Sequence, residues 1–324
     1  MGRTQLTMDV RGEGWRETVD PDCIGPLLGD CHNLLWLDIV DPGPAELELL
    51  RREFGFHELA IEDVEKLQVH QRPKYDTYQG YCFIVVYAAE HTADEFVARE
   101  LQLFVGENFL VTIHRGPLTV LDEARRRWAR HESRRDHGVG YLVYTVFDSL
   151  VDGYFPLQDW LGERMEAIER AVFMGAEGAA ADLFRLRKQL LRIRRLLAPT
   201  GDVLTEVIRR GQPRFPESLG PYFADVHDHS LHVLGELDSY GDLLGTALDV
   251  HAESMFLRLG QIMKRLTAIT VIIMVPNLVA SIYGMNFEVL FPPSGWEYGF
   301  FVVVGLLAWM IIWGFIHSRH MDWL

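Results

Sequence analysis

The stretch Tyr-Gly-Met-Asn-Phe, residues 283–287, closes a long apolar run with a glycine and an amide side chain. No charged residue occurs between Leu266 and Phe287. A run of this length is sufficient to cross the ~30 Å hydrocarbon core of a membrane as a helix. Glycine and asparagine continue such a helix poorly, so the pattern indicates that the span ends here, beside a side chain that carries an oxygen.

Polar side chains also recur inside the apolar run. Steps of four and three residues define a seam with a 3.5-residue period, which we name the polar seam: Asp249, Glu253, Phe256, Gly260, Met263, Thr267, Thr270, Met274, Asn277 and Ser281. Polar side chains in a span usually face a bundle interior or a water-filled path, although small and polar residues also hold neighbouring helices together. Spacing alone leaves both readings open. Two spans cannot enclose a path, so a pore requires several chains around one axis.

Residues 266–286 and 298–317 have the length of membrane spans. Arg258, Lys264 and Arg265 precede the first span and Arg319 follows the second, whereas the connecting loop has no basic residue. The positive-inside rule therefore predicts a multi-pass protein of the cell membrane with both termini in the cytoplasm. From Pro221 to Tyr283 the helical pattern has no evident stop, which predicts one helix of about sixty residues, roughly 90 Å long.

The composition narrows the function. The 324 residues include 31 Lys and Arg against 46 Asp and Glu, a net charge of −15. This balance suits cations and argues against nucleic acid, because phosphate contacts need basic residues. Cys23, Cys31 and Cys82 lack zinc-type spacing and fit reduced cytosolic thiols. The N-terminal residues show no signal peptide. The chain has no P-loop, G-x-S-x-G or H-E-x-x-H motif, so no enzyme activity is predicted.

Gly284-Met285-Asn286, at the end of the first of two C-terminal spans and after a very long helix, resembles the CorA family of magnesium transport proteins. Further segments that resemble this family are WLDIVDP (36–42), FGFHELAIEDV (54–64), HQRPKYDTYQGYCFIVVY (70–87) and DVHDH (225–229). The resemblance is least clear in the first thirty residues and from about 115 to 220. The loop EVLFPPSGWE departs from the acidic Met-Pro-Glu-Leu turn of many relatives.

The resemblance implies an α+β chain that assembles in the lipid bilayer as a funnel-shaped homopentamer. The expected parts are an α/β/α cytosolic domain with a helical hairpin extension (1–220), a stalk helix (221–265), a pore-lining span (266–286), an extracytoplasmic loop (287–297), a second span (298–317) and a cytosolic tail (318–324).

The resemblance also implies roles for single residues. The expected selectivity filter is Gly284, Met285 and Asn286, and the expected pore-lining residues are Asp249, Gly260, Met263, Leu266, Thr270, Met274, Asn277 and Ser281. Mg²⁺ gives up its water reluctantly, so Asn286 amide oxygens and Gly284 carbonyls would hold the hydrated ion through its waters. Met263, Leu266 and Met274 would form an apolar constriction that gates by dewetting.

Regulation is expected at acidic residues. Glu62, Asp63 and Asp225, with His229 beside them, match or adjoin positions where the family binds regulatory Mg²⁺ between subunits. Mutual repulsion of five acidic chains would open the ring, and bound Mg²⁺ would offset it and close the pore. Two further ideas come from spacing alone. One helix face carries Asp225, His229 and His232, and this set suits a transition metal. The basic segment 182–197 is expected to form an amphipathic helix, whose bases lie near the membrane or oppose the acidic residues of the seam.

Three functions therefore remain. The first is a Mg²⁺ channel or transporter with transported and regulatory Mg²⁺, and Co²⁺ or Ni²⁺ as alternative cargo. The second is a Zn²⁺ transporter of the same superfamily, against which the intact Gly-Met-Asn argues. The third is a membrane-anchored cytosolic sensor, for which the polar seam would be unnecessary.

Overall fold

The computed structural model describes residues 3–10, 14–17, 24–30, 33–66, 71–92, 95–130, 138–174, 176, 178–210, 214–285, 296–321 and 323. The chain divides into two compact units, Met1–Thr246 and Ala247–Leu324. The longest helix, α9 (Gly220–Tyr283), contributes residues to both. Cys23 and Cys31 lie outside the described residues, whereas Cys82 is buried and carries a free thiol.

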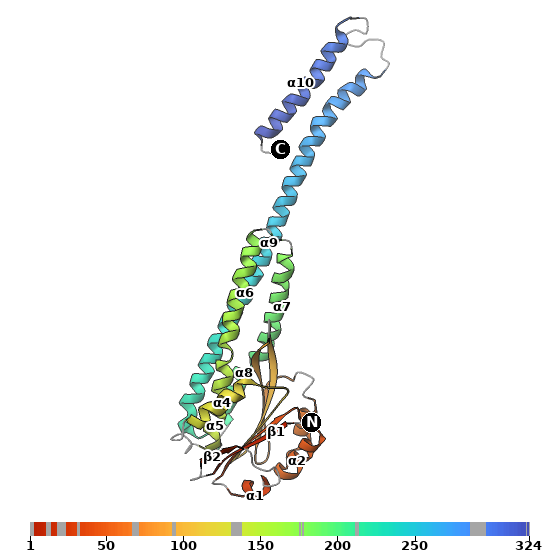
Figure 1. Cartoon of the computed structure of the whole chain (residues 1–324). Coiled ribbons are helices and arrows are strands. Elements are labelled where there is room, and N and C mark those ends of the chain that lie inside the picture. Colours follow the sequence, from red (N-terminus) through yellow and green to blue (C-terminus); the bar gives the residue numbers. More distant parts are fainter. Residues whose placement is uncertain are drawn as a thin grey trace. The chain divides into compact units, whose positions relative to one another are not determined.

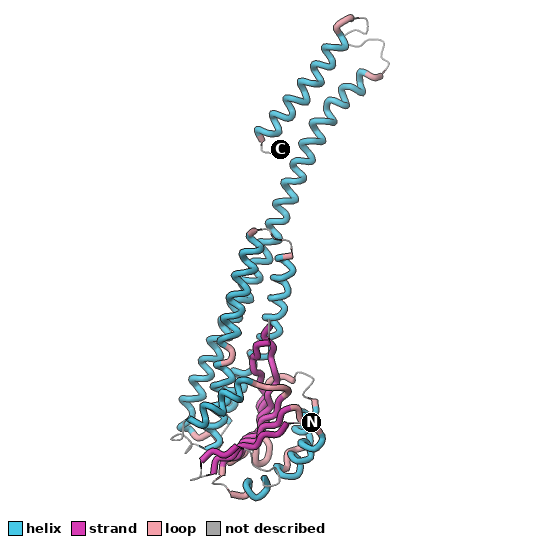
Figure 2. Tube along the Cα trace, viewed as in Figure 1, coloured by secondary structure: helices cyan, strands magenta, loops and turns pink. Residues whose placement is uncertain are grey.

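A seven-stranded mixed sheet lies at the centre of the first unit, in the order β2-β1-β3-β7-β6-β5-β4 (Figures 1 and 2). The strands are β1 (Arg3–Val10), β2 (Gly14–Glu17), β3 (Leu34–Val40), β4 (Lys74–Thr77), β5 (Cys82–Thr92), β6 (Glu95–Val105) and β7 (Phe109–His114). β3 and β7 are parallel, and the other neighbours are antiparallel. β5 is apolar on both faces because helices cover both sides of the sheet.

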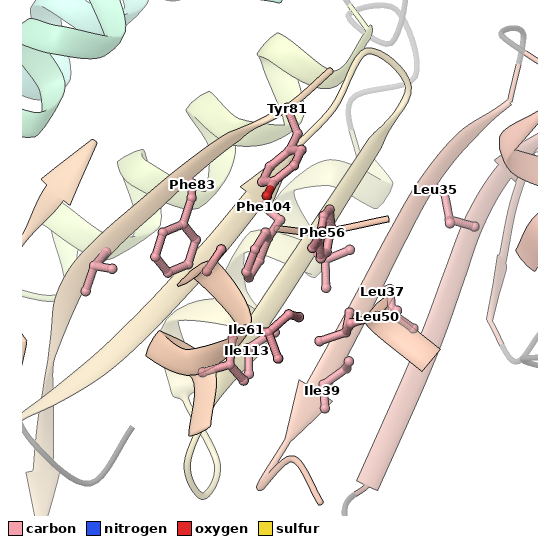
Figure 3. Packing of buried hydrophobic residues seen from close by; sticks show 14 of the residues in the cluster. Leu35, Leu37, Ile39, Leu50, Phe56, Ile61, Tyr81, Phe83, Phe104 and Ile113 are labelled. Atoms are coloured by element: carbon pink, nitrogen blue, oxygen red, sulfur yellow. The ribbon is translucent and has the colours of Figure 1, made fainter. Parts of the chain in front are cut away.

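Three short helices, α1 (Ile24–Leu28), α2 (Pro44–Phe54) and α3 (Glu58–Glu65), belong to one face of the sheet. Figure 3 shows the core beneath them, where the Phe56 ring stacks on Phe104 with 4.2 Å between centroids and lies 4.7 Å from Tyr81. α2 ends at Gly55, whose φ of 63° is left-handed and favours glycine. The His57 N–H then donates to the Tyr81 hydroxyl at 2.9 Å. These contacts fix the start of α3, which carries Glu62 and Asp63.

The remaining helices of this unit are α4 (Thr119–Arg130), α5 (Gly138–Asp152), α6 (Phe155–Phe173), α7 (Ala179–Leu197) and α8 (Pro199–Arg210), followed by the short helix η3 (Glu217–Leu219) and the first part of α9. α5, α7 and α8 pack against β5, which completes the α/β/α arrangement and confirms the expected fold class. α6 and α7, which follow one another in the chain, pack against each other.

The basic segment 182–197 lies within α7 and is amphipathic as predicted. It buries one apolar stripe: Leu183, Leu186, Leu190, Ile193 and Leu197. One of its bases, Arg194, donates to Asp238 of α9 at 3.0 Å. At this position the basic helix opposes an acidic residue of the long helix, although Asp238 is not one of the seam residues.

A buried polar network ties α4 to β3 and β7. The Trp36 indole donates to the Thr112 hydroxyl (3.0 Å), which donates to Asp38 (2.5 Å). His114 Nε2 lies 3.2 Å from the same carboxylate, and Arg125 Nη2 lies 2.5 Å from it. Burial would raise the pKa of Asp38, but the hydrogen bond and attraction of His114, the charge of Arg125 and the Thr112 hydroxyl together hold it below its ordinary value.

The second unit consists of the C-terminal part of α9 and of α10 (Gly299–His320), which run side by side (Figure 1). α9 continues through Pro276 to Tyr283, as expected for one long helix. Each helix contains a stretch of 18 residues that is long and apolar enough to be a candidate membrane span, and the mean hydropathies of these two stretches are 2.0 and 2.4. Only 11% of the apolar stretch in α9 and 6% of that in α10 is buried. Such exposed apolar faces are not those of a soluble core helix.

We expect Phe56→Ala to lower the free energy of unfolding of the first unit by about 3–5 kcal/mol, because a buried ring that stacks on two others leaves a cavity. Urea unfolding of the detergent-solubilised protein, followed by tryptophan fluorescence, measures this. Phe184→Ala on α7 is the matched control, since its ring is mostly exposed. Equal effects of the two substitutions would contradict the role of Phe56.

We expect Asp38→Asn to destabilise the first unit by ~3 kcal/mol at pH 7, because Arg125 then loses its buried partner and keeps only the exposed Asp122. The pKa of Asp38 is lowered on folding, so its contribution is present above the ordinary carboxyl pKa of 3.8 and is lost as the pH falls through the lower pKa of the folded protein.

Thermal unfolding midpoints of both proteins from pH 7 downward should therefore converge only in strong acid. Asp122→Asn is the control, because Asp122 pairs with the same arginine at 3.0 Å but is exposed, and such pairs contribute less than about 1 kcal/mol. Convergence already near pH 6 would show that Asp38 does not carry the effect.

Candidate functional site

One face of the membrane part of α9 is covered by α10. Ala268 is 2% exposed, Pro276 is buried and Ile272 is half-buried. A Cβ added at Gly314 of α10 would lie 3.3 Å from Ile272 Cγ1, so the two backbones approach closely there. The half-buried positions of α10 follow the same rhythm: Val303, Leu307, Met310, Gly314 and Ser318. This spacing is typical of two helices packed along one seam.

The polar seam lies on the other side of α9. Each residue turns an α-helix by about 100°, so the seam positions from 263 to 281 are centred about 180° from Ala268, Ile272 and Pro276. Met263 and Met274 are 55% and 61% exposed. The seam therefore does not serve the packing of α10 on α9. In a membrane it faces either lipid or another chain.

Hydroxyl groups along the seam bond to their own helix. Thr267 donates to Met263 O, Thr270 to Leu266 O and Ser281 to Asn277 O, each at 2.8 Å. These bonds use the hydroxyl hydrogens, so each hydroxyl oxygen can still accept a hydrogen bond through its lone pairs.

The amide of Asn277 differs from these hydroxyls. Its side chain is exposed and makes no hydrogen bond to any residue that the structure describes. An unsatisfied amide in hydrocarbon costs several kcal/mol, so it favours contact with water or another chain over contact with lipid.

α9 ends at the predicted filter. The Gly284 N–H donates to Ala280 O and Ser281 O (3.0 and 3.1 Å), and the Met285 N–H donates to Ile282 O (3.2 Å). Gly284 and Met285 thus form the turn that follows the helix, and Asn286 lies outside the described residues. At the other end of the seam, Asp249 and Gly260 are exposed positions of α9 within the second unit.

The acidic residues of α3 already have basic partners within the chain. Glu62 forms an ion pair with Lys66 one turn along the helix. Asp63 Oδ2 lies 2.6 Å from Lys74 Nζ of β4, and the same ammonium lies 2.8 Å from Asp76 Oδ2. The Asp63 side chain is 24% exposed. The α3 carboxylates are therefore accessible but not free of counter-charge.

Asp225 on α9 lacks such a close partner. Its side chain is 63% exposed, and the closest basic group among the described residues, His229 Nε2, lies 3.9 Å away. The rings of His229 and His232 lie near Phe155, at 6.1 and 6.5 Å between centroids. The described residues contain no group of three His, Cys, Asp or Glu placed to hold a metal. Asp225, His229 and His232 therefore do not form the suggested transition-metal site within one chain.

Two carboxylates that the sequence did not reveal, Asp148 and Asp152, lie together on α5, and the charge of Asp225 acts on Asp148. Arg127 of α4 donates to Asp148 (2.6 Å) and to Asp152 (2.7 Å) of α5. Burial, together with the charges of Asp152 and Asp225, raises the pKa of Asp148 despite Arg127. In the sequence, the only indication of this pair is that Asp148 and Asp152 are four residues apart and therefore share one face of a helix. Asp225 thus lies at the edge of an acidic group that one arginine partly neutralises.

Known proteins share this architecture. The model of the family "CorA-like Mg2+ transporter protein" matches residues 32–317. A putative metal ion transporter of Bacillus subtilis, YfjQ, is 34% identical over 289 residues, 89% of each chain. The cobalt/magnesium transport protein CorA of Thermotoga maritima is 28% identical over 98% of this chain and 91% of its own.

A solved structure shows the same fold. The complete structure of the CorA magnesium transporter from Methanocaldococcus jannaschii matches with a TM-score of 0.84 and 22% identity, over 99% of this chain and 98% of that one. The family match extends from β3 of the central sheet into α10, the second candidate span. The chain belongs to the family of CorA-like Mg²⁺ transporter proteins.

Proposed function

We propose that several copies of this chain, five by the family resemblance, line one axial pore with α9 and conduct hydrated Mg²⁺ across the cell membrane. The observation that carries this proposal is the direction of the polar seam, which points away from α10. Only another chain or a water-filled path satisfies such a face inside a membrane. Both termini lie in the cytoplasm under this proposal, since the basic residues flank the spans on one side.

Selectivity in this proposal lies at Gly284, Met285 and Asn286. Mg²⁺ requires near-octahedral oxygen geometry and dehydrates reluctantly. A ring of neutral amide oxygens holds its water shell without binding the ion too tightly to release it. The turn at Gly284 supports this role, because it brings backbone carbonyls to the end of α9. Asn277 supplies a second oxygen ring, and its unpartnered amide is suited to that use.

The rest of the pathway alternates between polar and apolar rings. Thr270 and Ser281 present oxygen lone pairs, because their hydroxyl hydrogens are held within α9. Met263, Leu266 and Met274 form the apolar constriction, where dewetting blocks a hydrated ion. Asp249 and Gly260 lie on the cytoplasmic side, where the Asp249 carboxylate attracts cations.

Regulatory Mg²⁺ binds, in this proposal, between Glu62 and Asp63 of one subunit and Asp225 and His229 of the next. One chain offers no complete metal site among its described residues, so a second copy must complete it. Exposed Asp225 is suited to that part. Bound Mg²⁺ reduces repulsion between acidic subunits and favours the closed state.

Co²⁺ remains beside Mg²⁺ as cargo, because the Thermotoga maritima relative is named a cobalt/magnesium transport protein. Ni²⁺ is a further candidate cargo, and uptake into proteoliposomes tests it as it tests Mg²⁺. The intact Gly-Met-Asn argues against Zn²⁺ as the principal ion.

We expect Asn286→Ala to abolish Mg²⁺ uptake into proteoliposomes while the assembly stays intact, because the filter loses its ring of amide oxygens. Uptake is followed with a Mg²⁺-sensitive dye inside the vesicles, and assembly by size-exclusion chromatography with light scattering. Ser254→Ala is the control, since Ser254 lies on α9 outside the polar seam and bonds to its own helix. Normal flux in Asn286→Ala would refute the filter assignment, and a monomeric parent protein would refute the pore.

We expect Asp225→Ala to raise the Mg²⁺ concentration needed for closure, because the interface loses one carboxylate ligand. The measurement is the rate of proteolysis of the full-length protein as a function of Mg²⁺. Asp182→Ala on α7 is the control, because it removes the same charge from an exposed residue that belongs to neither α3 nor α9. If Asp225→Ala responds to Mg²⁺ like the parent protein, the regulatory site does not include Asp225.

A further inference from the structure

The proposed regulatory site already contains a cation of its own. Lys74 Nζ lies between two carboxylates, 2.6 Å from Asp63 and 2.8 Å from Asp76. It also lies 5.1 Å from the centroid of the Phe83 ring, as in a cation–π contact. Both carboxylates favour the charged form, so the pKa of Lys74 is raised although burial alone would lower it.

The arrangement is held in place on both sides. The Asp63 carbonyl accepts hydrogen bonds from the side chains of Gln71 (2.8 Å) and Gln102 (3.1 Å). Lys74 and Asp76 are two residues apart on β4, so their side chains leave the same face of this edge strand. The Lys74 ammonium is thus held between the carboxylates of Asp63 and Asp76, unlike a lysine side chain that moves freely on a surface.

We propose that Lys74 is a tethered competitor of the regulatory divalent cation. This inference rests on the proposed function. A divalent ion that binds Asp63 must displace the ammonium or bind beside it, and repulsion between the two cations opposes both. The ion pair therefore raises the Mg²⁺ concentration at which the site fills, and the released lysine is exposed enough, at 33%, to enter water.

This assignment separates the roles of the acidic residues. Lys74 neutralises Asp63 when no metal is bound. Asp225 is exposed, and its basic neighbour among the described residues is a histidine at 3.9 Å. Asp225 supplies net attraction for the ion, and Asp63 supplies a ligand only after exchange. Lys74 thus sets the threshold of the response without being a metal ligand.

The test compares the Mg²⁺ midpoint for protection from chymotrypsin, which does not cut at lysine, in full-length parent protein, Lys74→Met and Lys74→Arg. Removing a unit charge ~5 Å from a divalent ion in water predicts a midpoint about tenfold lower in Lys74→Met. Lys74→Arg keeps the charge and should retain the parental midpoint. Lys188→Met on α7 is the matched control, because no ion pair is found for Lys188 among the described residues.

A midpoint in Lys74→Met that is unchanged or higher overturns the competition. The proposed function would still stand if Asp225→Ala raises the midpoint in the same assay. If the parent protein shows no saturable response to Mg²⁺, and Mn²⁺ binding measured by electron paramagnetic resonance is absent as well, both proposals fail. Lys74→Gln, with its thermal unfolding midpoint, serves as a second variant if Lys74→Met folds poorly.

Discussion

The structure of the second unit depends on one constraint, which is that hydrocarbon offers no partner to a polar group. α9 meets this constraint in two ways. Its apolar face packs on α10 through Ala268, Ile272 and Pro276, and its hydroxyls donate to carbonyls of the same helix. Among the described residues, the amide of Asn277 is satisfied in neither way, which supports the proposal that it faces the axis of an assembly.

The first unit handles charge differently at each depth. Inside the sheet, Asp38 is matched by Arg125, His114 and Thr112, so a buried carboxylate stabilises the fold. Nearer the surface, single bases hold pairs of acids together, as Arg127 and Lys74 do. At the exposed Asp225, by contrast, the closest basic group among the described residues is a histidine 3.9 Å away. Under the proposed function, a divalent cation would therefore act on the surface of this unit and not on its core.

Hydropathy and helical period were sufficient to predict the long helix and both candidate spans, because these properties belong to neighbouring residues. Gly284-Met285-Asn286 indicated the family for the same reason. Pairs such as Asp63 with Lys74, or Arg127 with Asp148, join elements that only the folded sheet brings together, so no local pattern reveals them. The spacing of Asp225, His229 and His232 predicted a shared helix face correctly, but a shared face without a third element opposite is no metal site.

The contrast between the two spans bears on the remaining alternative, a sensor that is merely anchored in the membrane. Anchoring requires only apolar area, and both helices supply it. α10 is apolar around its whole circumference, with no threonine or asparagine between Gly299 and Ile316. α9 instead carries Thr267, Thr270, Asn277 and Ser281 on the face that α10 leaves open. Each of these polar residues makes membrane insertion less favourable, and a helix that serves only as an anchor does not require them. This asymmetry supports the proposal that α9 lines the axis of a conducting assembly while α10 faces the lipid.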